Sequence, residues 1–211
     1  MRILFVDTTS FFVTISFIEN DTLKFLFNDI IKDDMSSKIM SIIREGTEKS
    51  GISLADIDKI MVCTGPGSFT GIRIGVTIAK TIAWALKKDI IGVSSLELYA
   101  SMNFDTKYII PMIDARRGYV YAGIYDSNLD VVLPDSYIEY DKLIKYFDNS
   151  TIVSYDSIEG AIKPKVDLLK IVKKHINDKS INCHTVNPNY LKITEAEENL
   201  RRMKNDKKDC E

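Results

Sequence analysis

The chain has 211 residues, of which 45% are hydrophobic and 27% are charged. This is the composition of an ordinary soluble globular protein with one large domain or two small ones. A formal net charge of −2 argues against unaided nucleic-acid binding, which usually needs a strongly basic surface. The three scattered cysteines form no CxxC pair, which fits a reducing compartment. No segment has the layout of a signal peptide or a membrane span, so we expect a cytoplasmic protein that does not contact a membrane.

The first 50 residues are expected to form three strands and a helix. Three apolar, β-branched segments separated by short polar breaks predict an antiparallel meander. These segments are residues 2–7, 11–19 and 22–31. The apolar spacing then becomes helical up to about Ser50, with Asp33 or Asp34 available as N-cap and Gly51 as the C-terminal stop.

A glycine-rich loop follows the next predicted strand, at 58–63, and leads into a helix over about 70–87. The sequence from Cys63 to Val76 is CTGPGSFTGIRIGV. Gly65 and Gly67 can adopt positive φ, so the loop can present backbone N–H groups at the positive end of the helix. Its spacing matches neither a Walker A loop nor a dinucleotide fingerprint. The loop is therefore either an anion site or a tight turn without a ligand.

An acidic residue at the end of the first strand is a second candidate for phosphate chemistry. Asp7 is followed by three hydroxyl side chains, and such a turn can hold a metal–nucleotide; alternatively, Asp7 caps the turn. The candidate nucleotide or anion residues are Asp7, Thr8, Gly65, Gly67 and Ser68.

The helix over 70–87 has an apolar arc wider than contact with one sheet requires. On a helical wheel its apolar residues form two stripes, and the small residues Ala79 and Ala83 would allow another helix to approach closely. The preceding helix covers the second surface within the chain, or both helices share an exposed face that pairs with another subunit. The candidate interface residues are Met35, Ile39, Ile43, Ile72, Val76, Ala79 and Ala83.

A short strand at 90–93 completes a β-β-β-α-β-α-β order, which predicts an α/β protein with mixed sheets flanked by helices. We expect a first half over 1–103 and a reduced second half over 104–211. Strands of the second half are predicted at 107–113, 119–126, 129–133 and 151–154, and helices at 140–147, 164–176 and from about 194. Lysine-rich residues in 163–175 and 201–208 form a solvated face or follow an RNA backbone.

Residues for independent catalysis are not apparent. His175 and His184 have no partner at metal-ligand spacing and are expected on the surface, so we predict no metal, cofactor or catalytic residue. In the turn IDARRG, Arg116 and Arg117 could bind an anion or pair locally with Asp114.

Four segments in this order and spacing resemble the TsaB family of bacterial tRNA threonylcarbamoyladenosine biosynthesis proteins. They are ILFVDTTS, TGPGSFTGIRIG, PMIDARRGYVYAGIYD and NPNYLKITEAEE. The resemblance implies an actin-like ATPase, Hsp70 and sugar-kinase type fold with two ribonuclease H-like halves. It also implies a role as the non-catalytic partner of a TsaD-like subunit, which transfers a threonylcarbamoyl group to a tRNA adenosine. A TsaE-like ATPase joins the pair, and tRNA is bound through the complex.

Further expectations follow from the same resemblance. TsaD-like proteins hold a metal through paired histidines on their first long helix, whereas DDMSSKIM stands there in this chain, with Met35 where many TsaB-like sequences have a lone histidine. The glycine loop and the Asp7 turn match a nucleotide-site position of the fold, although TsaB-like proteins bind ATP poorly. The isolated chain is expected to form a homodimer. The alternative is an actin-fold ATPase or kinase that uses Asp7 and Gly65–Ser68.

Overall fold

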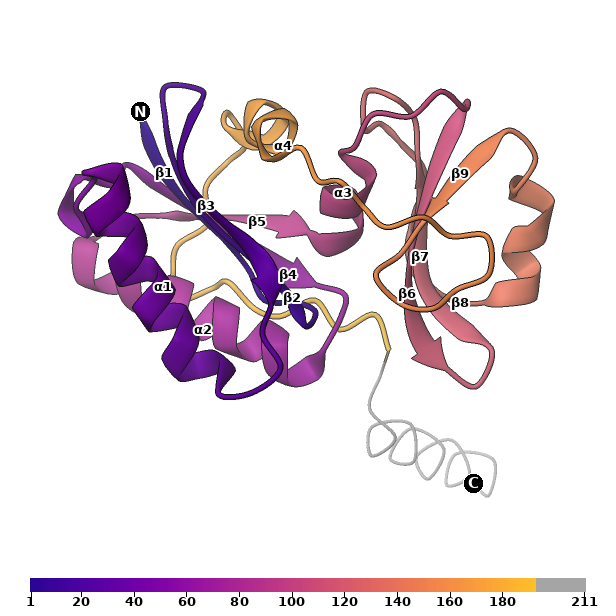
Figure 1. Ribbon diagram of the computed structural model, residues 1–211, viewed down its shortest axis with the longest axis horizontal. Coiled ribbons are helices and arrows are strands. Elements are labelled where there is room, and N and C mark those ends of the chain that lie inside the picture. Colours follow the sequence, from indigo (N-terminus) through magenta and orange to yellow (C-terminus); the bar gives the residue numbers. More distant parts are fainter. Residues whose placement is uncertain (193–211) are drawn as a thin grey trace, which may run out of the picture.

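The computed structural model describes residues 1–192 and shows two sheets side by side (Figure 1). The first sheet has the strand order β3-β2-β1-β4-β5. Its strands are β1 (Arg2–Asp7), β2 (Phe12–Glu19), β3 (Thr22–Ile30), β4 (Lys59–Gly65) and β5 (Ile90–Ser94). β1, β2 and β3 pair antiparallel, and β4 and β5 extend the sheet in parallel from β1. The predicted meander and mixed sheet are confirmed.

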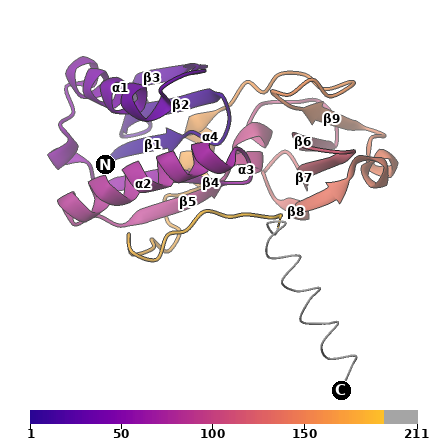
Figure 2. The ribbon, with the colours of Figure 1, turned by 90° about the horizontal axis from the view of Figure 1, so that it is seen from below.

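Helices cover both faces of the first sheet (Figures 1 and 2). They are α1 (Met35–Ser50) and α2 (Phe69–Leu86) on one face, and α3 (Ser95–Ala100) and α4 (Leu168–His175) on the other, with a 3₁₀ turn η1 (Leu54–Asp56) before β4. Gly51 ends α1 in the left-handed region at φ 70°, as predicted. Asp34 occupies the N-cap position of α1, as predicted, but its side chain forms no capping hydrogen bond.

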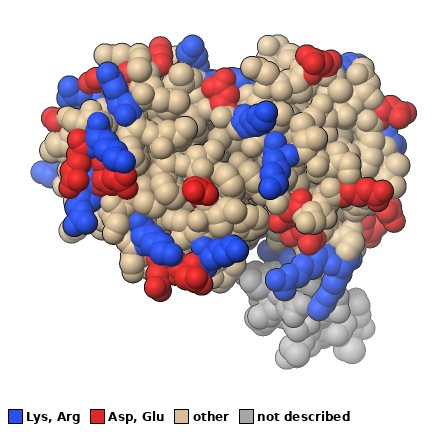
Figure 3. Space-filling view, in the orientation of Figure 1, with Lys and Arg blue, Asp and Glu red and all other residues tan. Residues whose placement is uncertain are grey.

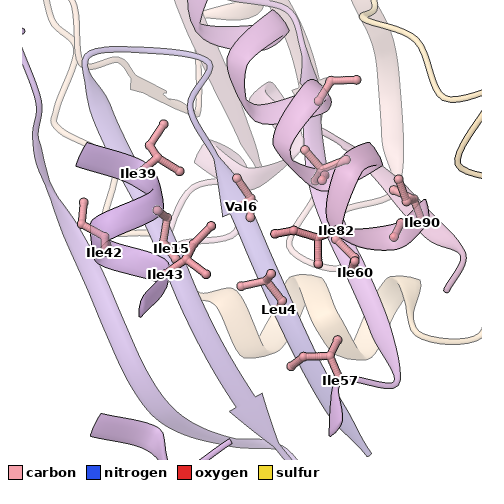
Figure 4. Packing of buried hydrophobic residues seen from close by; sticks show 14 of the residues in the cluster. Leu4, Val6, Ile15, Ile39, Ile42, Ile43, Ile57, Ile60, Ile82 and Ile90 are labelled. Carbon is pink, nitrogen blue, oxygen red and sulfur yellow. The ribbon is translucent and has the colours of Figure 1, made fainter. Parts of the chain in front are cut away.

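The sheet is buried on both sides, because alternate residues of its central strands meet different helices. Leu4 and Val6 pack in the cluster with α1 and α2, whereas Ile3 and Phe5 pack in the cluster with α3 and α4. Figure 4 shows the first cluster, in which isoleucines of α1 and α2 lie over β1, β2 and β4. All four strand residues are at most 1% exposed. Such burial accounts for the long apolar runs of these strands.

The second sheet has the strand order β8-β7-β6-β9. Its strands are β6 (Tyr108–Arg116), β7 (Tyr119–Tyr125), β8 (Val131–Glu139) and β9 (Ser150–Val153), with the 3₁₀ helix η2 (Tyr140–Tyr146) between β8 and β9. β8 is longer than predicted, and η2 replaces the predicted α-helix at 140–147. The last predicted helix, from about residue 194, lies outside the described residues.

The chain returns to the first half after the second sheet. Residues 177–192, here called the strap, form an extended segment that runs beside α2 (Figure 1). Ile181 and Ile90 exchange two backbone hydrogen bonds, and the Asn189 N–H donates to the Thr64 carbonyl oxygen at 2.7 Å. The helix predicted over 164–176 is the shorter α4, which also packs on the first sheet. Within the described residues, α4 and the strap thus contact the first half although they follow the second sheet in the sequence.

Helix α2 has the length and apolarity of a membrane-spanning helix, with 18 residues and a mean hydropathy of 1.2. It is nevertheless built into the core, because Ile72, Val76 and Ala79 are at most 3% exposed beneath the sheet. On another side of the helix, the Lys80 ammonium donates to the Val186 carbonyl oxygen of the strap at 2.9 Å. These contacts are those of a core helix in a globular domain. Absence of membrane contact stays a prediction.

Candidate functional site

The candidate nucleotide residues do come together, at the N-terminal end of α2. The turn after β1 lies directly against the glycine loop, where the Ser68 N–H donates to the Thr9 carbonyl oxygen at 2.6 Å. The Thr8 hydroxyl donates to the Gly71 carbonyl oxygen at 2.7 Å, and Ser68 caps α2 by accepting from the Gly71 N–H at 3.2 Å. The Thr9 carbonyl oxygen and the Ser68 hydroxyl oxygen thus accept two N–H groups that a phosphate would need.

Glycines permit this contact. A Cβ atom at Gly67 would collide with the Thr9 carbonyl oxygen, and one at Gly71 would collide with the Thr8 carbonyl oxygen. At Gly75 the obstacle would be the Thr8 hydroxyl. The repeated glycines therefore serve the close packing of two chain segments, which is the interpretation of a tight turn without a ligand.

The strap covers the other side of the same loop. The Asn189 carbonyl oxygen lies 2.8 Å from where a Cβ of Gly65 would stand. Tyr190 stacks on Phe69 with ring centroids 5.0 Å apart, and its hydroxyl oxygen accepts from Arg73 Nε at 2.8 Å. Residues from both ends of the described chain thus contact the N-terminal end of α2, where Ser68, Phe69 and Thr70 remain exposed.

Asp7 caps its own turn. Its Oδ1 accepts hydrogen bonds from the Thr9 N–H at 2.9 Å and the Thr9 hydroxyl at 2.7 Å, and the side chain is 1% exposed. Burial raises the pKa of Asp7 to about 6, against the opposing effect of the Thr9 and Cys63 hydrogen bonds. The geometry matches the capping interpretation rather than the metal–nucleotide interpretation.

A cleft of about 350 Å³ lies between the two sheets, beside the Asp7 turn. Its lining from the first half is Thr9, Ser10, Phe11, Ile31, Lys32, Met35, Gly67, Ser68 and Tyr99, and from the second half Ile113, Asp114, Tyr121, Tyr155 and Asp156. Burial raises the pKa of Asp156 above its usual range; the Asp114 N–H that it accepts opposes this rise, and the Asp114 carboxylate adds to it. Asp114 in turn accepts the backbone N–H of Arg116 at 2.8 Å. The cleft is acidic and aromatic.

Most of the predicted interface residues do not form an exposed face. Met35 is half-buried at the cleft, and the other six are at most 3% exposed in the core of the first half. Those six are Ile39, Ile43, Ile72, Val76, Ala79 and Ala83. Their assignment to a subunit surface is corrected, because this stripe packs against the sheet and against α1 within the chain.

A different apolar stripe, on the outward side of α1 and α2, remains partly exposed to solvent. Met40 of α1 is 48% exposed, and Ile74 and Ile78 of α2 are half-buried beside it. With Ser36, Arg73 and Thr77 they line a shallow groove of about 350 Å³, here called the α1–α2 groove. The prediction of two apolar stripes holds, but the free stripe contains Ile74 and Ile78 rather than Ala79 and Ala83.

A buried ionic cluster connects α4 to α3, and the sequence did not indicate it. Glu97 is 7% exposed and binds the Lys174 ammonium at 3.1 Å and His175 Nε2 at 2.9 Å. The Glu97 hydrogen bond raises the pKa of His175 despite its burial, and Asp178 contributes at 2.6 Å. His175 therefore lies in a structural cluster, not on the surface as predicted. Within residues 1–192, no three acidic, histidine or cysteine side chains converge in a way suited to a metal.

Known proteins resemble this chain over most of its length. Residues 29–182 match the model of the family described as "TsaD: tRNA N6-adenosine threonylcarbamoyltransferase". The tRNA threonylcarbamoyladenosine biosynthesis protein TsaB of Bacillus subtilis is 32% identical over 224 residues, which cover 93% of this chain and 96% of that protein. The chain belongs to the TsaB family.

The chain is also similar to a threonylcarbamoyltransferase and, in fold, to a solved structure. A tRNA N6-adenosine threonylcarbamoyltransferase of Clostridium novyi is 31% identical over 132 residues, covering 60% of this chain and 37% of that protein. The solved structure of YeaZ from Pseudomonas aeruginosa superposes with a TM-score of 0.77 at 18% identity, over 90% of this chain and 99% of that chain. The α/β fold of this TsaB-family chain is of the actin-like ATPase, Hsp70 and sugar-kinase type, as the resemblance implied.

Proposed function

We propose that the chain is a non-catalytic subunit of the complex that forms threonylcarbamoyladenosine in tRNA. The observation that carries the proposal is that N–H groups at the N-terminal end of α2 are already bonded within the chain. A phosphate loop needs donors that point to the ligand, whereas the Ser68 N–H donates to Thr9 and no side chain can be added at Gly67 or Gly71. Asp7 is likewise engaged within its own turn. The transfer chemistry then belongs to a TsaD-like partner, with a TsaE-like ATPase in the assembly.

The α1–α2 groove is the surface that we assign to the partner. Its apolar centre is Met40, Ile74 and Ile78, and Arg73 and Thr77 form part of its lining. An apolar centre with polar residues around it is the usual composition of a protein interface. We propose that the same surface forms the homodimer when the chain is isolated, with two copies related by a two-fold axis.

The remaining expectations complete the proposal. The complex acts in the cytoplasm without membrane contact, and tRNA binds mainly through the partner. Acidic and basic side chains are interspersed on the face in Figure 3, and the net charge of −2 supports no extended basic field for RNA.

Reconstitution tests the role directly. The chain is combined with the TsaD-like and TsaE-like proteins of the same organism, the threonylcarbamoyl donor and unmodified tRNA, and modified adenosine is measured. We expect modification only when the chain and the TsaD-like protein are both present, and none with the chain alone. Modification by the chain alone would contradict the non-catalytic role, and ATP hydrolysis by the chain that Asp7→Asn abolishes would favour the ATPase or kinase alternative.

A further inference from the structure

The cleft between the sheets has the wrong charge for a nucleotide phosphate. Asp114 and Asp156 both line it, and each uses one carboxylate oxygen to accept a backbone N–H at 2.8 Å. Neither carboxylate forms an ion pair with any residue of the described part of the chain. Their second oxygens are therefore acceptors available to a ligand that carries N–H donors.

Aromatic rings enclose the same space. Tyr99, Tyr121 and Tyr155 line the cleft, and Tyr155 is held by stacking on Phe12 with ring centroids 4.5 Å apart and planes 8° apart. The Tyr99 ring meets Tyr155 edge to face at 5.0 Å. Carboxylates and aromatic rings that line one cleft are a combination that attracts organic cations.

An independent observation concerns the Tyr99 hydroxyl group. Tyr99 is 1% exposed, and its buried hydroxyl oxygen forms no hydrogen bond of normal geometry among the described residues, although the Ser10 hydroxyl interacts with it. Buried polar atoms without partners are rare because leaving one unpaired destabilises the fold. A ligand N–H group in the cleft would give this oxygen a partner.

We propose that the cleft binds an organic cation with N–H donors, a guanidinium or ammonium group, between Asp114, Asp156 and the tyrosine rings. The cation comes from a free small molecule or from a lysine or arginine side chain of a partner protein. Lys32 lies at the same cleft, is exposed and forms no ion pair within residues 1–192, so it opposes the bound charge. Cation binding is independent of the proposed role in tRNA modification.

The test uses N-acetylarginine amide, which carries a guanidinium charge and no other, against the isotope-labelled chain observed by NMR. The neutral isostere N-acetylcitrulline amide is the ligand control. We expect saturable shifts of cleft amides with a dissociation constant on the order of 1 mM, and none with the citrulline compound. Asp114→Asn and Asp156→Asn should each weaken binding about fivefold or more, because each removes a charged acceptor but keeps the backbone hydrogen bond.

Two further variants sharpen the result. Asp148→Asn removes an exposed carboxylate elsewhere in the second half and should leave the affinity unchanged, whereas Lys32→Gln should raise it. Absence of saturable shifts up to about 100 mM probe, or equal affinities for the Asp156→Asn and Asp148→Asn chains, would overturn the proposal.

Adding the TsaD-like partner distinguishes the two sources of the cation, a partner side chain and a free small molecule. If a partner side chain fills the cleft, adding the partner abolishes probe binding, and Asp114→Asn and Asp156→Asn weaken the association of the two proteins. If the ligand is a free small molecule, the probe binds the assembled complex as it binds the isolated chain.

Discussion

Two parts of helix α2 contrast sharply. At its N-terminal end, the turn after β1 and the strap pack against the glycine loop, and three glycines allow atoms of Thr8 and Thr9 to approach the backbone. Along its outward side, Ile74 and Ile78 stay half-exposed beside Met40. N–H groups that a phosphate would need are bonded within the chain at one end of α2, whereas the side that would bind a protein is open. A sequence motif shaped like a ligand loop can thus be a packing device.

Closure of the loop is tested most strongly at Gly71. Alanine in a helix is normally more stable than glycine by about 0.5–1 kcal/mol. Here we expect Gly71→Ala to lower the free energy of unfolding by about 3 kcal/mol, because the new Cβ collides with the Thr8 backbone. Urea denaturation measures the effect.

The control for Gly71→Ala is Gly51→Ala, at a position with φ 70° where a Cβ would contact nothing within 4 Å. Gly51→Ala should lower the free energy of unfolding by only about 1–2 kcal/mol, because alanine is strained in the left-handed region. A stabilised Gly71→Ala chain would show that the turn and the helix are not in contact.

Burial of Asp7 predicts a pH-dependent stability difference. The pKa is about 6 in the folded state and near 3.8 in the unfolded state, so the folded state holds the proton more tightly. Stability from this group is fully present below pH 4 and is lost as pH rises to about 6. Relative to Asp7→Asn, the free energy of unfolding of the natural chain should therefore fall by up to about 3 kcal/mol as pH rises across this range. Denaturation at several pH values measures the difference. A difference that does not change with pH would contradict the buried carboxyl.

The open side of α2 is tested by Ile78→Glu. A carboxylate in the α1–α2 groove should weaken binding to the TsaD-like subunit tenfold or more, equivalent to about 1.4 kcal/mol, and should also dissociate the homodimer. Sedimentation and a binding titration measure both effects. Ser127→Glu adds the same charge on an exposed turn of the second half and should change neither. Unaltered association of the Ile78→Glu chain would show that the partner binds elsewhere.

The smallest expected effect concerns the lysines near α4. Lys174 binds Glu97, so it is structural and is left unchanged. The exposed Lys163, Lys165 and Lys173 are replaced together by Gln, and tRNA binding to the complex is titrated at several salt concentrations. We expect an unchanged salt dependence, as for a solvated face. Each phosphate contact would instead reduce the slope of log K against log salt by about 0.7–0.9. Predicted contacts from 201–208 lie outside the described residues.

Local sequence patterns predicted most of the secondary structure. Strand alternation, the helical period and Gly51 predicted β1 to β5, α1 and α2 because they depend on neighbours in sequence. Even the missed helix α3 had a local signal, since Ser94 and Glu97 have the spacing of a capping box; Ser94 does accept the N–H groups at its start.

Contacts between residues far apart in the sequence determined the features that the sequence did not predict. The wide apolar arc of α2 did not say which stripe meets the sheet, so Ala79 was assigned to a surface although it is fully buried. Glu97 and His175 are 78 residues apart, and only the return of α4 to the first half brings them together. The strap over the glycine loop was likewise invisible, because it depends on the same return.

The most direct test of the account is tRNA modification by the reconstituted complex with Asp7→Asn or Ile78→Glu in this subunit, measured near pH 7.5. The account predicts that Asp7→Asn supports modification at the rate of the natural chain, because Asp7 caps a turn. Ile78→Glu should reduce modification through lost association and recover when the subunit concentration is raised. Modification abolished by Asp7→Asn in a folded, fully associated complex would contradict the account and place chemistry at this subunit.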